Sequence, residues 1–115
     1  MIVERGEVWL TEFAPARGEE IGKTRPAVIL SVAEIGKLDL KIVVPITDWK
    51  DRYSDYVWFA RIEPTRGNGL SKTSGADAFQ CKSFSLERFK KKLGRISDIE
   101  LEEIVACVAL CIGLQ

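Results

Sequence analysis

Polar and apolar residues follow one another along most of this chain in patterns that predict β-strands. A period of two, or a short run rich in β-branched and aromatic residues, marks six segments. The predicted strands cover residues 7–13, 25–32, 40–46, 56–62, 75–82 and 92–96. Pro45 is expected to place the end of the third strand at an edge or a bulge. Between the strands, long loops are predicted at 14–24, 47–54 and 63–73, and one helical turn at 86–91.

The C-terminal segment has the clearest helical pattern. Ser97 and Glu100 form a Ser-x-x-Glu capping box, and Asp98 suits the positive end of the helix dipole. An apolar stripe at helical spacing follows, made of Ile99, Ile104, Val105, Val108 and Ile112. Many short strands and one terminal helix predict a mainly β fold, a small and strongly bent barrel whose open end the helix covers.

Length and composition favour one soluble domain. The 115 residues suffice for one core, so we expect a single domain over residues 1–115. The sequence has no apolar run of membrane-spanning length, and its first residues are charged, unlike a signal peptide. We therefore expect a cytoplasmic protein with no membrane partner.

The charges of the chain balance, with 17 basic and 17 acidic residues. A strongly basic total, which would point to nucleic acid, is missing. Any nucleic-acid site must therefore come from a local basic patch. Basic residues do cluster, at Lys23 with Arg25, at Lys50 with Arg52, and in the run at 88–92, where a solvated surface is the simpler interpretation.

The chain contains no histidine, and this excludes several kinds of site. Histidine acid/base pairs, Ser-His and Cys-His nucleophiles and histidine-bearing zinc sites are all ruled out. The three cysteines, Cys81, Cys107 and Cys111, form no Cys-x-x-Cys pair and are interpreted as reduced core thiols. We expect no metal ion and no other cofactor.

The segment 19–30 gives the strongest indication of a functional site. A charged loop with Gly22 leads directly into an apolar strand, and Arg25 stands at the junction. Pro26 biases Arg25 toward an extended backbone. An arginine held at the mouth of a loop by a buried strand can bind a phosphate with two donors. In an arbitrary protein such an arginine more often makes a surface salt bridge. The position of Arg25 alone therefore does not distinguish a phosphate site from a salt bridge.

Five stretches in order carry a family resemblance. They are Gly6-Glu7-Val8-Trp9-Leu10; Gly18 through Arg25-Pro26 to Ser31; Val43-Val44-Pro45-Ile46-Thr47; Gly69-Leu70-Ser71-Lys72 with Gln80-Cys81-Lys82-Ser83; and Lys92-Leu93-Gly94-Arg95-Ile96-Ser97. Together they resemble the MazF/PemK family of toxin endoribonucleases over nearly the whole chain. No single motif would suffice, but their joint order does.

The resemblance implies a fold, an activity and partners. The fold is an SH3-like barrel of the CcdB/PemK type, assembled as a homodimer. The activity is metal-independent, sequence-selective cleavage of single-stranded RNA, which leaves a 2′,3′-cyclic phosphate and a 5′-hydroxyl. A small acidic cognate antitoxin holds that activity in check.

By position, the resemblance also implies site residues. Arg25 and Thr47 match the catalytic arginine and threonine of the family, Glu20 matches a loop glutamate, and Gln80 matches a site-lining glutamine. The chain departs from the family at Phe79, where Asp is common, and at Ser71 and Thr73, where Pro and Asp are common. These departures bear on substrate preference more than on chemistry.

RNA binding requires further residues around this pair. Trp49 and Tyr53 lie in a polar, basic loop, where at least one is expected to stack on a base, although a ring folded back onto the barrel edge is nearly as good an interpretation. Trp9 and Trp58 lie within predicted strands and are interpreted as structural. The expected RNA-binding residues are Lys23, Trp49, Lys50, Arg52, Tyr53 and Lys82.

Two other functions stay open at this stage. A CcdB-like toxin that binds a protein such as DNA gyrase would not need Arg25 or Thr47, and would be expected to have an apolar or tryptophan-ended C-terminal helix. This chain ends Gly113-Leu114-Gln115. An inactive barrel that serves as an interaction module is the other alternative, and the presence of both Arg25 and Thr47 argues against it.

Overall fold

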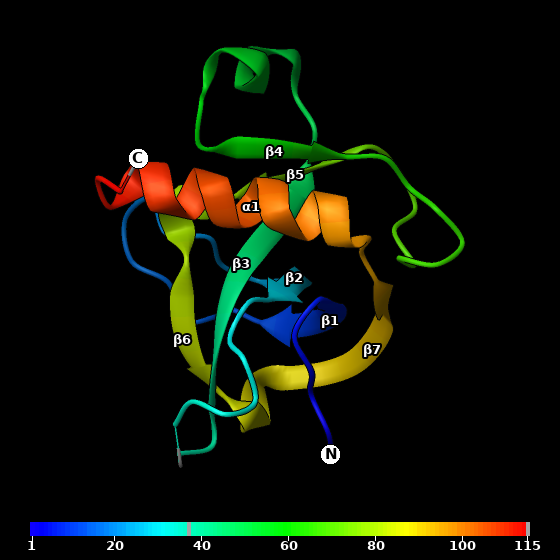
Figure 1. Ribbon diagram of the computed structural model, residues 1–115, viewed down its shortest axis with the longest axis vertical. Coiled ribbons are helices and arrows are strands. Elements are labelled where there is room, and N and C mark those ends of the chain that lie inside the picture. The colour runs from blue at the N-terminus through cyan, green and yellow to red at the C-terminus, as the bar shows by residue number, and fades with distance from the viewer. Residues whose placement is uncertain (37, 115) are drawn as a thin grey trace.

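A strongly bent antiparallel sheet forms the body of the protein, and one long helix crosses it (Figure 1). The computed structural model describes residues 1–36 and 38–114. The strands are β1 (Glu7–Glu12), β2 (Thr24–Ile29), β3 (Leu40–Asp48), β4 (Phe59–Ile62), β5 (Ser74–Asp77), β6 (Lys82–Ser85) and β7 (Phe89–Arg95). The helices are the 3₁₀ turns η1 (Asp51–Asp55), η2 (Ala78–Gln80) and η3 (Leu86–Arg88), and the α-helix α1 (Asp98–Cys111).

The strands follow the order β4-β5-β3-β2-β1-β7, and β6 also pairs with β3. Every pairing is antiparallel. This confirms the predicted fold class, mainly β with a C-terminal helix. The sheet bends strongly without closing, since β4 and β7 end the order among the described residues and do not pair.

Two apolar cores lie on opposite faces of the central strands. Because side chains alternate along a strand, Val28 and Val44 face one core, whereas Ala27 and Val43 face the other. The first core lies under α1 and includes Leu101 and Ile104 of that helix. The second contains the larger aromatic residues, Trp9, Phe13, Phe84 and Phe89.

The helix begins as predicted but buries a different stripe. Ser97 and Glu100 form the expected capping box. The residues of α1 that are buried are Leu101 and Ile104, whereas Ile99 is 70% exposed and Val105 and Ile112 are also exposed. Residues two positions apart lie on nearly opposite sides of an α-helix, so burial of Leu101 turns Ile99 outward. The predicted stripe was therefore wrong at Ile99, Val105 and Ile112.

Pro45 does not end its strand, contrary to the prediction. β3 continues to Asp48, and Pro45 pairs with Ala27 of β2. On its other edge, β3 pairs with β6 up to Val43 and with β5 from Ile46 onward. Pro45 therefore lies where β3 exchanges one neighbour for another, a position at which a missing N–H costs no ladder bond.

Several predicted boundaries also moved. The strand predicted at 25–32 is shorter and ends at Ile29, and the one at 56–62 begins only at Phe59, because a turn occupies Tyr56 to Trp58. The segment 75–82 contains a short strand and then η2. The helical turn at 86–91 is a 3₁₀ turn of three residues, and β7 begins directly after it.

The described part of the chain has no helix long and apolar enough to cross a bilayer.

A buried carboxylate fastens β1 to β7. Glu7 is only 4% exposed and accepts hydrogen bonds from Trp9 Nε1 at 3.0 Å and from the backbone N–H of Glu4 at 2.8 Å. Its other oxygen lies 2.7 Å from Lys92 Nζ. Burial by itself would raise the pKa of Glu7, but the hydrogen bonds from Lys92, Trp9 and Glu4 outweigh it, so this pKa lies below its ordinary value.

The substitution Glu7→Gln is expected to lower the free energy of unfolding at pH 7 by about 1–3 kcal/mol. Because the folded pKa lies below the unfolded value, the stabilisation is complete above pH of about 4.3 and is lost as pH falls through the folded pKa. Urea unfolding of both proteins should show their difference shrinking between pH 7 and acid. Glu4→Gln is the control, since the Glu4 carboxylate is exposed and makes one 3.6 Å ion pair. A difference that is independent of pH would contradict the assignment.

Candidate active site

Arg25 and Thr47 meet across the ends of β2 and β3. Ala27 pairs with Pro45 in antiparallel strands. Arg25, two residues before Ala27, and Thr47, two residues after Pro45, therefore lie at the same end and on the same face of the sheet. Arg25 Nη1 donates to Thr47 Oγ1 at 3.5 Å. The sequence prediction that these two residues act together is thus consistent with their placement.

The surroundings of the Arg25 guanidinium lack a carboxylate. Among the described residues, no Asp or Glu lies within ion-pair distance of it. Its Nε is buried and has no hydrogen-bond partner there. A structural arginine at a strand start normally pairs with an acid, and a buried donor without a partner is costly. No carboxylate of the described residues therefore neutralises the Arg25 guanidinium.

A cavity of ≈ 210 Å³ opens beside this pair. Its lining includes Arg25, Thr47, Asp48, Leu70, Ser71 and Lys72. At its rim, Lys72 Nζ lies 3.0 Å from Asp48 Oδ2, and both side chains are largely exposed. Sequence reasoning gave Asp48 and Lys72 no role, although Asp48 directly follows Thr47 and Lys72 ends one of the family-like stretches. The pairing of β3 with β5 sets Asp48 opposite Ser74, and this brings Lys72, two residues before Ser74, close to the Asp48 carboxylate.

Gly69 fixes the position of that loop. Its φ is +69°, and a Cβ atom at this position would lie 2.2 Å from the carbonyl oxygen of Leu93 on β7. Only glycine allows both the left-handed backbone and this close approach. The loop that carries Leu70, Ser71 and Lys72 is thus held at the mouth of the cavity by main-chain packing.

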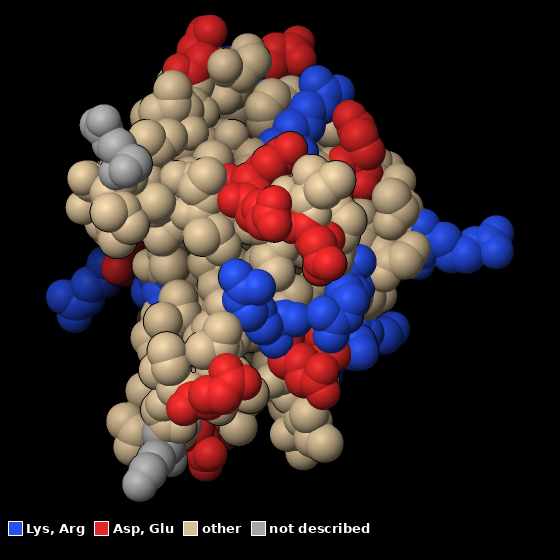
Figure 2. Space-filling model, in the orientation of Figure 1, with Lys and Arg blue, Asp and Glu red and all other residues tan. Residues whose placement is uncertain are grey.

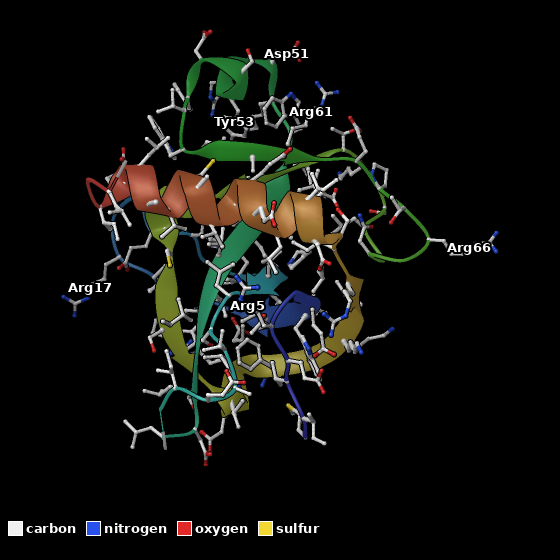
Figure 3. The ribbon with its side chains drawn as sticks, in the orientation of Figure 1. Arg5, Arg17, Asp51, Tyr53, Arg61 and Arg66 are labelled. Atoms are coloured by element: carbon white, nitrogen blue, oxygen red, sulfur yellow. The ribbon has the colours of Figure 1, made fainter. Side chains whose placement is uncertain are left out.

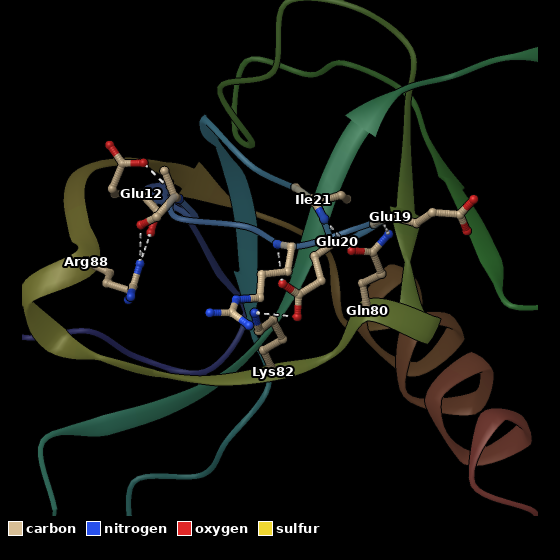
Figure 4. A network of polar contacts seen from close by, with 9 residues as sticks. Glu12, Glu19, Glu20, Ile21, Gln80, Lys82 and Arg88 are labelled. Carbon is tan, nitrogen blue, oxygen red and sulfur yellow. Dashed lines mark hydrogen bonds and ion pairs between the residues drawn. The ribbon is translucent and has the colours of Figure 1, made fainter.

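Glu20 and Gln80 lie apart from the cavity of Arg25 and Thr47. They line a second hollow of ≈ 420 Å³, together with Glu19, Phe79, Cys81 and Lys82. Glu20 accepts from the backbone N–H of Arg17 at 2.7 Å, and its other oxygen lies 3.8 Å from Lys82 Nζ (Figure 4). In this arrangement the Glu20 carboxylate already has partners, so it does not stand beside the Arg25–Thr47 pair.

The Gln80 side chain joins two distant segments. Its Oε1 accepts from the backbone N–H of Ile21 at 2.6 Å, and its Nε2 donates to the carbonyl oxygen of Glu19 at 3.4 Å (Figure 4). Nε2 also donates to Asp77 Oδ2 at 3.2 Å. The hydrogen-bonding groups of this amide are thus engaged with the protein. Asp77, which sequence reasoning overlooked, is a buried carboxylate that the sequence pattern alone does not reveal.

The aromatic residues of the second loop fold back onto the sheet. Figure 3 shows Tyr53 between η1 and β4. The Tyr53 ring stacks on Phe59 with centroids 4.0 Å apart, and Trp49 packs edge-on against Tyr53 at 5.8 Å. The guanidinium of Arg61 lies 5.3 Å from the Trp49 ring centroid. The rings are thus folded back onto the edge of the sheet, the alternative to an open ring that stacks on a base.

Trp9 and Trp58 differ in burial and in the secondary structure to which they belong. Trp9 is buried in the second core, as predicted. Trp58 belongs to the turn before β4 and stacks on Tyr56 at 4.7 Å, so its predicted place within a strand was wrong.

Charge is distributed unevenly over the surface. The α1 sequence contains four carboxylates and no lysine or arginine, and acidic side chains gather along this helix in Figure 2. A polyanion would not be attracted to that face. Lys23, Lys50 and Arg52 are exposed on other elements, and Lys82 is half-buried beside Glu20.

Comparison with known proteins identifies relatives over almost the whole chain. Residues 4–112 match the family described as PemK-like, MazF-like toxin of type II toxin-antitoxin system. The chain is 29% identical over 119 residues to endoribonuclease MazF9 of Mycobacterium tuberculosis, covering 98% of both chains.

Solved structures show the same fold. MazF of Deinococcus radiodurans superposes with a TM-score of 0.82 at 23% identity, covering 99% of each chain. An endoribonuclease from a mycobacterial species, solved in complex with its cognate antitoxin, superposes with a TM-score of 0.76 at 15% identity, covering 99% of this chain and 98% of the other.

Gly69→Ala is expected to lower the free energy of unfolding by more than about 2 kcal/mol, since it combines a left-handed backbone with a clash against main chain. Gly36→Ala is the matched control, because Gly36 also has a positive φ, +86°, but a Cβ atom added there would meet none of the described atoms within 4 Å. That control should cost about 1 kcal/mol. Urea unfolding measures both. Equal losses would show that the contact with Leu93 has no energetic weight.

Proposed function

This chain belongs to the family of PemK-like, MazF-like toxins of type II toxin–antitoxin systems, and from that premise we propose that Arg25 and Thr47 cleave single-stranded RNA. As a member, the protein is a toxin endoribonuclease rather than a CcdB-like toxin that binds a protein target. The observation that carries the site proposal is the contact between Arg25 and Thr47 at a cavity, where no carboxylate of the described residues pairs with the guanidinium.

The chemistry needs no nucleophile from the protein. The RNA 2′-oxygen attacks the adjacent phosphorus, and the bond from phosphorus to the 5′-oxygen breaks. The products are a 2′,3′-cyclic phosphate and a 5′-hydroxyl, with the 2′-proton lost to a base and a proton gained by the leaving oxygen. Negative charge grows on the nonbridging oxygens during this step. Arg25 and Thr47 donate hydrogen bonds to those oxygens, and fixed donors of this kind contribute about 3–4 kcal/mol each.

Neither member of the pair is a good base. Arginine stays protonated near neutral pH, so Arg25 acts as a hydrogen-bond donor to the phosphate and the leaving oxygen, whose proton comes from water. Glu20 could support proton transfer only after leaving its contacts with Arg17 and Lys82. Gln80 acts on the loop rather than on the phosphate. Water completes the proton transfers, which is consistent with slow turnover that needs no metal ion.

The surroundings of the cavity supply RNA binding. Lys23 directly precedes the strand of Arg25, and Lys50 and Arg52 follow the strand of Thr47. These cations meet the phosphates on either side of the cleaved bond, and Lys82 contributes from the second hollow. Trp49 and Tyr53 contact unpaired bases at the same end of the sheet with the part of each ring that its packing against Arg61 or Phe59 leaves exposed.

Membership of the family supports a proposal for the partners and location. In this proposal the toxin acts in the cytoplasm as a homodimer, and a small acidic cognate antitoxin binds it and blocks cleavage. Relatives with this fold have been solved together with their antitoxins.

Arg25→Ala and Thr47→Ala should each lower the cleavage rate of a long single-stranded RNA by about 10²–10³-fold, measured with EDTA present and by mapping the new ends. Thr47→Ser keeps the hydroxyl and should keep most of the activity. Arg66→Ala is the matched arginine control, since Arg66 points away from the body of the protein (Figure 3). Cleavage that survives both alanine substitutions would overturn the assignment, and cleavage abolished by EDTA would show a metal-dependent reaction.

Neutralising Lys50 and Arg52 together to Gln should weaken RNA binding and reduce the salt slope, log Kd against log[salt], by about 1.4 for two lost phosphate contacts on a single strand. The control is the double change of Lys90 and Lys91 to Gln, in β7, which should leave the slope unchanged. The measurement is fluorescence anisotropy of a labelled RNA between low and moderate salt. An unchanged slope in the Lys50 and Arg52 variant would remove this loop from the binding surface.

A further inference from the structure

Asp77 is a buried acid that the proposed chemistry does not use. The residue is only 7% exposed. Among the described residues no lysine or arginine lies within ion-pair distance of its carboxylate. Its oxygens accept instead from the backbone N–H of Phe79 and from Gln80 Nε2, both at 3.2 Å. Burying a carboxylate without a cation costs folding free energy, so a function for Asp77 in these two contacts would explain its presence.

One role is to fix the orientation of the Gln80 amide. An amide group can turn by 180° and exchange its oxygen with its nitrogen, and hydrogen-bond partners decide between the two states. An ionised carboxylate only accepts, so Asp77 requires the NH₂ group of Gln80 on its side. In that state Oε1 faces the backbone N–H of Ile21, and Nε2 also reaches the carbonyl oxygen of Glu19. Turned over, the amide would set a donor against the Ile21 N–H.

Through Gln80, this orientation acts on the loop between β1 and β2, residues 13–23. Most of this loop is exposed, so little apolar burial holds it. At its base, Arg88 Nη1 donates to the carbonyl oxygens of Glu12 at 3.0 Å and Ala14 at 2.8 Å (Figure 4). Toward its far end, two of the bonds that cross to the rest of the protein come from Gln80.

The loop lies beside the proposed site. Ile21 packs against the core that contains Ala27 and Val43, which share their sheet face with Arg25 and Thr47. The loop therefore covers this face just before the polar end where Arg25 stands. It also forms one wall of the ≈ 420 Å³ hollow whose other wall is η2 and β6.

We propose that Asp77 is a positioning residue for RNA binding, acting through Gln80 to hold the β1–β2 loop as a preformed wall of the RNA groove. This inference rests on the proposed function. Ordering a free backbone costs about 1–2 kcal/mol per residue, so a loop that is ordered in advance leaves more of the contact energy for affinity. Loss of the pair therefore weakens binding while the Arg25–Thr47 chemistry, once RNA is bound, continues.

The test uses Asp77→Ala, Gln80→Ala and the double variant. The probe is a fully 2′-O-methylated oligoribonucleotide, which lacks the nucleophile and cannot be cleaved. Each single variant should raise its Kd by about 5- to 10-fold, and the double variant by no more than either single one, because both residues act through the same contacts. Asp77→Ala removes a negative charge, so charge alone would tighten binding to RNA. Weaker binding therefore cannot be an electrostatic effect.

Two further readouts separate positioning from simple loss of structure. Amide hydrogen exchange at Ile21 should accelerate about 10-fold or more in both single variants, without acceleration in the core strands. With cleavable RNA, KM should rise while kcat changes less than about twofold, whereas partial unfolding would lower the apparent kcat and leave KM unchanged. Asp77→Asn keeps the oxygen that caps η2 but sets an NH₂ group against Gln80 Nε2, so it should weaken RNA binding and accelerate Ile21 exchange even if Asp77→Ala folds poorly.

The outcomes distinguish this inference from the function on which it rests. If the wild-type protein neither binds nor cleaves RNA, the proposed function fails, and Ile21 exchange still decides whether Asp77 and Gln80 hold the loop. If the wild-type protein binds and cleaves, but Kd and Ile21 exchange are unchanged in both single variants, the positioning role is overturned. An increase in Kd for the double variant that equals the product of the two single increases would also overturn the positioning role.

Discussion

The register of β2 against β3 is the constraint on which the rest of this structure depends. It sets Ala27 opposite Pro45 and so turns Val28 and Val44 into the core under α1. The same register carries Arg25 and Thr47 to one face at the polar end of the pair. A slip of one residue would exchange the two faces of β2, so Val28 would leave the core under α1 and Arg25 would turn away from Thr47. Stability and the candidate site are therefore fixed by one set of hydrogen bonds.

Pro45 allows β3 to serve two different neighbours. Along one edge it pairs with β6 up to Val43, and from Ile46 it pairs with β5. The proline has no N–H to leave unsatisfied in the gap between them. Into this gap fits η2, which carries Gln80 toward the β1–β2 loop.

In the proposed reaction the protein works with fixed donors instead of titratable groups. With no histidine and a balanced net charge, it can supply neither an imidazole base nor a broad positive field. What it can supply is geometry: an arginine beside a hydroxyl, a small cavity, and a loop held by an amide. Preorganised donors stabilise developing charge without reorganising at the moment of reaction. The acidic face along α1 leaves the polar ends of β2 and β3 as the surface suited to a polyanion.

The sequence by itself determined the mainly β fold, the capping box at Ser97 and the candidate pair of Arg25 with Thr47, because these depend on local periodicity and on residues in a recurring order. It did not determine which side of α1 is buried, where Pro45 lies, or that Glu20 and Gln80 stand away from the cavity. Those depend on how strands far apart in the chain pair and on the angle at which the helix crosses them. The surroundings of Asp48, Lys72 and Asp77 were likewise decided only by the tertiary structure, since burial and ion pairing arise from neighbours that no local pattern specifies.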